Sequence, residues 1–314
     1  SGSAGTVRVE RDGIVIASLP YTVDQRADCP KADITVPSAE APTLQAAVAG
    51  VADANHDGRL VVHVRPGLYR ERVTIDRPLE LMGSGRDNTI VQGDGGGTAV
   101  TASVAGVIVR GLTVVGGQTG VALAAGARLV DSRVWRNRGA GVVLDGVGAE
   151  VVDSAAEANG GAGVWFAAAG ASCAGSRLDG NHGPGVDVSG AANASIVGNL
   201  LLENAGGVLV NGASGVVVAG NRSVLNLGSG VELLEAEDGT VTNNLCAGND
   251  EDGLSLERAD GALIGGNTFD DNNGYGLFVR RTAADFAVAA GIQAPLGDNA
   301  ASGNRKGDLF VRED

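Results

Sequence analysis

The chain has 314 residues, of which 51 are glycine and only 3% are aromatic, and it contains three cysteines. Its formal net charge of −14 argues against a nucleic-acid partner, because phosphate binding needs a basic face. No run is apolar and long enough to span a membrane, and three cysteines do not make a disulfide framework.

Residues 1–40 precede the regular part of the chain and contain two strand-like runs, at 6–10 and 13–23. We expect them to form an extra edge or a small separate unit at the N-terminal end. The opening Ser1–Ser3 is typical of an engineered leader, so we expect that a native export signal preceded this sequence.

A short helix is predicted over 41–53, with Pro42 and Thr43 at its start. Its apolar residues share one face: Leu44, Ala47, Val48 and Val51. Such a helix would plug the N-terminal end of an open hydrophobic core.

The stretch "DANHDG" at 53–58 has the spacing of the first half of a calcium loop. Its candidate Ca²⁺ ligands are Asp53, Asn55 and Asp57. The carboxylate required at the twelfth position is replaced by Val64, so a plain polar turn after the helix remains an alternative.

A repeat of 21 to 23 residues then runs to about residue 280. Its first marker is a glycine followed by Val or Leu, at positions 120, 141, 163, 185, 207, 230, 253 and 276. Its second marker is an asparagine shortly before each glycine, at 137, 159, 181, 204, 226, 249 and 272. Its third marker lies five residues before each asparagine: Ser132, Ser154, Ser176, Asn199, Asn221, Asn244 and Asn267. A period of this length indicates stacked repeats.

Each repeat holds three short runs with period two, which predicts three strands per coil. Stacking the coils about 4.8 Å apart pairs each strand in parallel with its equivalent in the next coil. We therefore predict an all-β fold, a single-stranded parallel β-helix of about ten coils over 41–284, in which the asparagines form a ladder. Cys173 and Cys246 fall at inward positions. The period breaks after residue 284, so 285–314 are expected to form an irregular C-terminal cap.

The frame N-x-x-x-G-[VL], with G-N or D-S five residues before its asparagine, resembles the right-handed parallel β-helix of the pectin lyase-like superfamily. The resemblance is greatest to its NosD-like carbohydrate-binding and sugar-hydrolase (CASH) repeats. It extends over roughly 40–280, and 43–85 resemble the entry helix and first coil. The resemblance implies an exported protein that holds its substrate along a strand face, but the superfamily includes lyases, hydrolases, esterases, epimerases and inert adhesins. The Asp-Pro-His triplet of alginate epimerases is absent, and three histidines and one methionine are few ligands for NosD-type copper.

One outward face of the predicted coils carries aromatic and acidic residues. Its first column is Ala122, Val143, Trp165, Asp187, Leu209, Glu232, Ser255 and Phe278. The second column is Ala124, Asp145, Ala167, Ser189, Asn211, Leu234, Glu257 and Arg280, with Glu235 just beyond. Aromatic rings stack on pyranose rings and carboxylates accept hydroxyl hydrogens, so this face suits an extended sugar chain. The predicted substrate-binding residues are Asp145, Trp165, Asn211, Glu235, Glu257, Phe278 and Arg280.

The predicted catalytic pair is Asp187 and Glu232. They lie two coils apart, which puts their backbones about 9–10 Å apart, near the separation that glycosidase carboxylates use. A lyase would instead use acids that hold Ca²⁺ against a uronate, with Arg222 or Arg280 as the base. The alternative for the acids is that they only solvate the strand surface.

His182 stands in a turn, where it is a candidate general acid or base that would meet Asp187 or Asp179. A tolerated surface histidine is the alternative. The acid-rich turn 249–253 could hold a cation.

The sequence thus predicts an exported, extracellular or periplasmic, carbohydrate-active or carbohydrate-binding β-helix that acts on an extended polysaccharide by lyase or hydrolase chemistry. The rival function is a non-catalytic surface, adhesion or assembly protein. A monomer is expected, without a nucleic-acid partner or a membrane span.

Overall fold

The computed structural model describes residues 4–11, 14–22, 30–280 and 298–312. The chain divides into two units, Ser1–Lys31 and Ala32–Asp314. In the first unit, β1 (Ala4–Arg11) pairs antiparallel with β2 (Ile14–Thr22). Cys29 lies outside the described residues.

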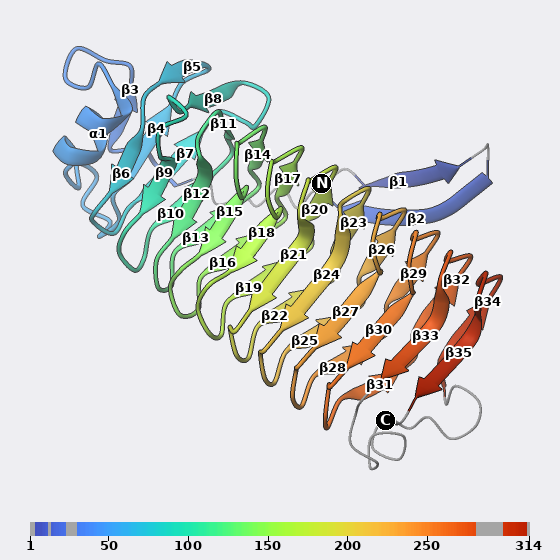
Figure 1. Cartoon of the computed structure of the whole chain (residues 1–314). Coiled ribbons are helices and arrows are strands. Elements are labelled where there is room, and N and C mark those ends of the chain that lie inside the picture. Colours follow the sequence, from blue (N-terminus) through green and yellow to red (C-terminus); the bar gives the residue numbers. More distant parts are fainter. Residues whose placement is uncertain (1–3, 12–13, 23–29, 281–297, 313–314) are drawn as a thin grey trace. The chain divides into compact units, whose positions relative to one another are not determined.

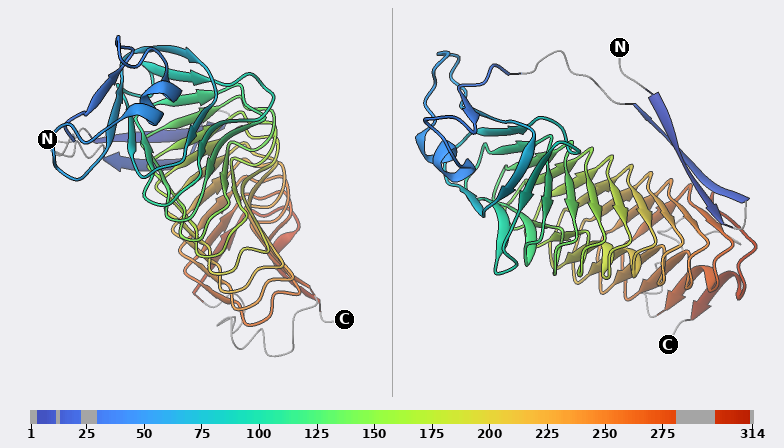
Figure 2. Two further views of the ribbon diagram at one scale, coloured as in Figure 1. Left: turned by 90° about the vertical axis from the view of Figure 1, so that its left-hand side faces the viewer. Right: turned by 90° about the horizontal axis from the view of Figure 1, so that it is seen from above.

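The second unit is a parallel β-helix, as the repeat predicted (Figure 1). Three sheets of eleven strands run along it, and from β4 to β33 each coil gives one strand to each sheet. The coils of this unit are stacked one after another along a common axis (Figure 2). The predicted fold class, with three strands per coil, is therefore confirmed.

Sheet 1 consists of β3 (Ile34–Val36), β4 (Val61–Val64), β7 (Glu80–Gly83), β10 (Ile108–Arg110), β13 (Arg128–Val130), β16 (Glu150–Val152), β19 (Ser172–Ala174), β22 (Ser195–Val197), β25 (Val217–Ala219), β28 (Thr240–Thr242) and β31 (Leu263–Gly265). Sheet 2 consists of β5 (Gly67–Arg70), β8 (Thr89–Gln92), β11 (Thr113–Val115), β14 (Arg133–Trp135), β17 (Ala155–Glu157), β20 (Arg177–Asp179), β23 (Leu200–Leu202), β26 (Arg222–Val224), β29 (Leu245–Ala247), β32 (Thr268–Asp270) and β34 (Ala300–Ser302). Sheet 3 consists of β6 (Val73–Ile75), β9 (Thr98–Ala102), β12 (Thr119–Leu123), β15 (Val142–Leu144), β18 (Val164–Phe166), β21 (Pro184–Ser189), β24 (Gly206–Asn211), β27 (Val231–Leu234), β30 (Leu254–Glu257), β33 (Tyr275–Arg280) and β35 (Gly307–Arg312).

The core is one continuous column of apolar side chains inside the coils, most of them aliphatic, with Phe166 and Phe269 among the largest. On β21, Val186 and Val188 are fully buried, while Asp187 between them points outward because side chains alternate along a strand. Cys173 and Cys246 are buried core residues, and burial raises the pKa of both thiols to about 12. The two thiols therefore act as small apolar side chains.

The predicted asparagine ladder runs along the corner between sheets 2 and 3. Asn159 Nδ2 donates to Asn181 Oδ1 at 3.0 Å and to the carbonyl oxygen of Val134 at 3.1 Å. The ladder continues in every following coil as far as Asn304. Each buried amide is thereby satisfied by its own copy, which holds adjacent coils in register.

Helix α1 (Leu44–Gly50) lies at the N-terminal end of the sheets (Figure 1). Thr43 Oγ1 accepts a hydrogen bond from the Ala46 amide, and Glu71 accepts hydrogen bonds from the first two helical amides. Its buried side chains are those of Leu44, Ala47 and Val48. Val51, the fourth residue of the predicted face, is also buried but follows the helix, which is shorter than the predicted 41–53. In the part of the chain described here, no helix has the length and apolarity to cross a membrane.

The β-helix extends beyond both predicted boundaries. At the N-terminal end, β3 precedes residue 41 and already pairs with β4. At the other end, β34 and β35 pair in parallel with β32 and β33, so 298–312 are regular rather than an irregular cap. This coil was not predicted from the sequence, because the interval between successive ladder asparagines lengthens to 32 residues between Asn272 and Asn304. The expected cap residues 285–297 lie outside the described residues.

Candidate functional site

The sheet-3 face comprises the outward side chains of sheet 3 from β15 to β35 and of the residues that directly follow its strands. Strand pairing places Trp165 beside Asp187, Asp187 beside Leu209, and Leu209 beside Glu232. Further along, Ser255 pairs with Phe278. The two columns predicted from the repeat therefore form one continuous surface.

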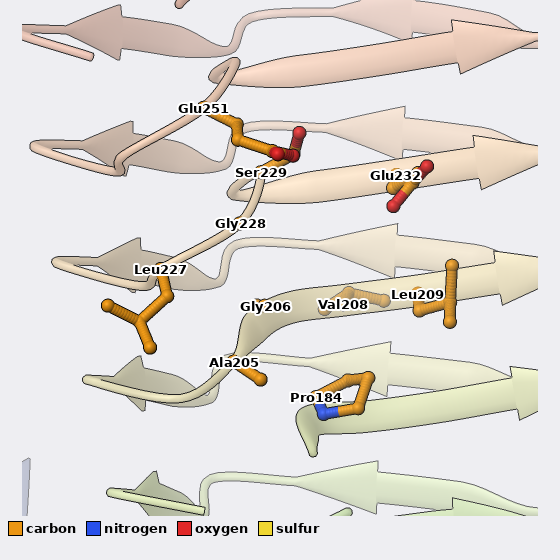
Figure 3. A pocket seen from close by; sticks show the side chains of 11 residues that line it. Pro184, Ala205, Gly206, Val208, Leu209, Leu227, Gly228, Ser229, Glu232 and Glu251 are labelled. Carbon is orange, nitrogen blue, oxygen red and sulfur yellow. The ribbon is translucent and has the colours of Figure 1, made fainter. Parts of the chain in front are cut away.

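A hollow of about 250 Å³ lies on this face and spans four successive coils (Figure 3). Several of its lining residues have little or no side chain, among them Ala205, Gly206 and Gly228, while Pro184, Leu209 and Leu227 also line it. Glu232 and Glu251 line it from neighbouring coils. The small residues leave open space where these coils meet.

Glu232 lines this hollow and has a shifted pKa. Partial burial raises its pKa above the usual range, and the negative charges of Glu251, Glu257 and Asp252 raise it further. Asp252, on the turn before β30, also has a raised pKa because it is partly buried. The hydrogen bond that it accepts from the Tyr275 amide, at 2.6 Å, opposes this effect. A carboxyl group that holds its proton to higher pH is suited to general-acid chemistry.

The raised pKa of Glu232 predicts a pH-dependent gain in stability for Glu232→Gln. A carboxyl group whose pKa is higher in the folded protein than in the unfolded chain does not lower the free energy of unfolding at pH values below its unfolded pKa of about 4.3. Above its folded pKa, the ionised group lowers the free energy of unfolding by the full amount. The variant should therefore unfold at a higher temperature than the native protein at pH 7 and lose this advantage at pH 3.5, with a gain below about 1 kcal/mol. Thermal unfolding followed by circular dichroism at both pH values measures it. A gain that is equal at both pH values would contradict the assignment.

Asp187 lies two register steps from Glu232, with Leu209 between them. The Ser189 hydroxyl donates to Asp187 Oδ1 at 2.6 Å and fixes the carboxylate over the strand. Two steps of the parallel sheet separate the two backbones by about 9–10 Å. That spacing leaves room for a sugar ring and a water molecule.

Aromatic side chains stand at both ends of the sheet-3 face. Trp165 is 40% exposed at one end. At the other end, Phe278 and Phe310 stack with ring centroids 5.0 Å apart and an interplanar angle of 4°. Tyr275 lies 5.0 Å from Phe310. The sequence pointed to Trp165 and Phe278 but missed Tyr275, which lies outside the two columns, and Phe310, which belongs to the displaced last coil.

The remaining predicted binding residues lie along the second column of the same face. Strand pairing joins Asn211 to Leu234, Leu234 to Glu257, and Glu257 to Arg280. Arg280 Nη2 donates to Glu257 Oε1 at 2.6 Å. Glu235 forms an ion pair with Arg258 at 2.7 Å, and Asp145 follows β15 directly.

Arg222 and His182 are not brought into this group. Arg222 lies on sheet 2 between Leu200 and Leu245, where burial lowers its pKa. His182 is exposed on the turn before β21, and Asp179 forms an ion pair with Arg177 on sheet 2 instead. The acidic column on sheet 3 therefore stands apart from Arg222, whereas Arg280, the other arginine predicted as a base, lies on this face and pairs with Glu257.

The loop 53–58 is held by hydrogen bonds from its own backbone. Asp53 accepts from the amides of Asp57 and Gly58, and Asn55 Oδ1 accepts from the Asp57 amide at 3.0 Å. Asp57 Oδ1 accepts from the Arg59 amide at 2.9 Å. Within the described ranges, no three His, Cys, Asp or Glu side chains converge closely enough to hold a metal ion.

Comparison with known proteins identifies the architecture. The family model described as "Right handed beta helix region" matches residues 79–201 and 140–290. No curated protein matches the sequence.

Three solved structures have the same fold. The A-module of mannuronan C-5 epimerase AlgE6 from Azotobacter vinelandii is 17% identical, with a TM-score of 0.65 over 85% of this chain and 83% of its own. The AlgE4 A-module from the same organism is 16% identical, with a TM-score of 0.61 over 85% and 92%. Tailspike protein 2 of Escherichia coli O157:H7 bacteriophage CAB120 is 12% identical, with a TM-score of 0.58 over 89% of this chain and 41% of its own. At these identities the likeness concerns the fold.

Proposed function

The chain belongs to the family of right-handed β-helix proteins, and from this premise we propose that it binds an extended polysaccharide along its sheet-3 face. One observation carries the proposal: a single in-register column joins an exposed tryptophan, a hollow with a perturbed carboxyl group, and a pair of stacked phenylalanines. Aromatic rings provide flat apolar area for pyranose faces, and carboxylates accept hydroxyl hydrogens. Repetition along the face suits a polymer better than a compact ligand.

The chemistry that fits this arrangement is glycoside hydrolysis. Glu232, which holds its proton to higher pH, would protonate the leaving oxygen, and Asp187 would activate a water molecule. The backbones of Asp187 and Glu232 lie about 9–10 Å apart, and carboxyl groups that project in parallel from them would have the wider separation of inverting enzymes, so we expect hydrolysis to invert the anomeric carbon. A polysaccharide ligand is also supported by the names of structural neighbours, which include a mannuronan C-5 epimerase and a phage tailspike protein.

Trp165→Ala should weaken glycan binding by roughly ten- to thirtyfold, because the exposed aromatic anchor at one end of the face is lost. The chain contains two tryptophans, and Trp135 on sheet 2 provides a matched control. Isothermal titration against neutral, basic and acidic oligosaccharides measures the change. Equal affinities for Trp165→Ala and Trp135→Ala would place the binding site elsewhere.

An extracellular or periplasmic location and a monomeric state belong to the same proposal.

Calcium binding at 53–58 remains a prediction, with Asp53, Asn55 and Asp57 as the ligands. If the loop binds calcium, the ion should raise the melting temperature of the native protein and leave that of Asp57→Ala unchanged. Equal melting temperatures of the native protein with and without calcium would leave the loop as a hydrogen-bonded turn.

A further inference from the structure

The middle of the sheet-3 face is strongly acidic. The four coils that form the hollow contribute the segments 180–190, 203–212, 225–235 and 248–258 to this face and the turn before it. These segments contain eight acidic residues and a single arginine, Arg258, which pairs with Glu235. Burial raises the pKa of Glu232 most, and the neighbouring carboxylates raise it further because they repel its negative charge.

A polyuronate would place one more carboxylate opposite these groups in each sugar unit. Like charges brought together in an interface oppose association, and opposite charges favour it. A chain that carries amino groups would instead bring an ammonium toward the acidic residues around Glu232, among them Glu251 and Asp252. The hollow offers room for such groups beside small residues such as Ala205 and Gly206.

The aromatic ends set the length of the ligand. Trp165 and Phe278 lie in the first and last of six successive coils of sheet 3. Five steps of about 4.8 Å separate them, about 24 Å in all. A pyranose unit in an extended chain is about as long as one such step, so one unit falls on each coil.

We infer that the sheet-3 face takes a basic, amino-sugar polysaccharide, whose amino groups lie over the acidic middle and which needs six units to reach both aromatic ends. The inference rests on the proposed function, because it names the ligand class of the same face. The inferred ligand differs from mannuronan, the polysaccharide in the names of two structural neighbours.

The test compares three hexasaccharides in calorimetric titrations at about pH 6, where exposed carboxylates are ionised. The glucosamine hexamer should bind roughly tenfold more tightly than the N-acetylglucosamine hexamer, which has the same backbone without the charge. It should lose most of this advantage at high salt. The mannuronate hexamer should bind most weakly, with or without calcium. The glucosamine tetramer should bind more weakly than its hexamer.

Glu251→Gln should lower the preference for glucosamine several-fold, because it removes one charge beside the hollow and leaves Glu232 in place. Asp153→Asn is the matched control, since it removes the same charge from the corner between sheets 1 and 2. Equal binding of the three hexamers, or tightest binding of mannuronate, would overturn the inference and leave the proposed function standing. Failure of every hexamer to bind would overturn both.

Discussion

Replacing Gly207 with alanine should destabilise the β-helix by roughly 2–4 kcal/mol, because the added methyl group would overlap the next coil. A Cβ atom at this position would collide with Ser223 Oγ and with the carbonyl oxygen of Gly230. Those two atoms are themselves joined by a buried hydrogen bond of 2.7 Å. The shift of the urea midpoint measures the loss.

Gly206 is the matched control, because it is the preceding residue on the same strand. A Cβ atom there would have a single neighbour, Ser229 O at 4.0 Å, and neither glycine has a positive φ. Gly206→Ala should therefore change stability by less than about 1 kcal/mol. Similar midpoints for the two variants would show that the close stacking of coils does not explain the repeated glycine.

The second large effect concerns hydrolysis. Glu232→Gln and Asp187→Asn should each lower the rate of glycan cleavage by roughly 10²- to 10⁴-fold, since each removes a proton-transfer group. The double variant should be little slower than either single variant, because the two groups act in one step. Reducing-end release from the preferred oligosaccharide measures the rates.

Asp153→Asn should cleave at the native rate, since its carboxylate lies at the corner away from sheet 3. Cleavage that survives the double substitution of Asp187 and Glu232 would remove the catalytic assignment. Tight glycan binding without cleavage in the native protein would favour the non-catalytic rival, in which the β-helix serves as a rigid binding surface.

Much of the fold follows from the sequence because parallel stacking converts sequence period into position. Once the step of 21 to 23 residues was recognised, Trp165, Asp187 and Glu232 had to lie on one face, and strand pairing confirms this. The repeated glycine has a physical reason, since a Cβ atom at Gly163 would lie 2.7 Å from the carbonyl oxygen of Gly185. The buried asparagines also recur for a physical reason, because their side-chain amides hydrogen-bond to one another along the ladder.

Features that depend on shape could not be predicted in the same way. The hollow requires several small residues to meet across coils, and the sequence alone does not show their combined volume. The last coil was missed because its ladder interval is 32 residues instead of 23, and Phe310 was missed with it. Arg222 was placed near Glu232 along the chain, but a corner separates their sheets.

The most direct test of glycan binding to the sheet-3 face uses Trp135→Phe, which leaves Trp165 as the sole tryptophan of the chain. Titration of this variant with an oligosaccharide of six units should shift the emission of Trp165, because a sugar ring displaces water from its exposed indole. The midpoint of that shift should equal the dissociation constant measured by calorimetry. Saturable binding by calorimetry with an unchanged Trp165 spectrum would contradict the account.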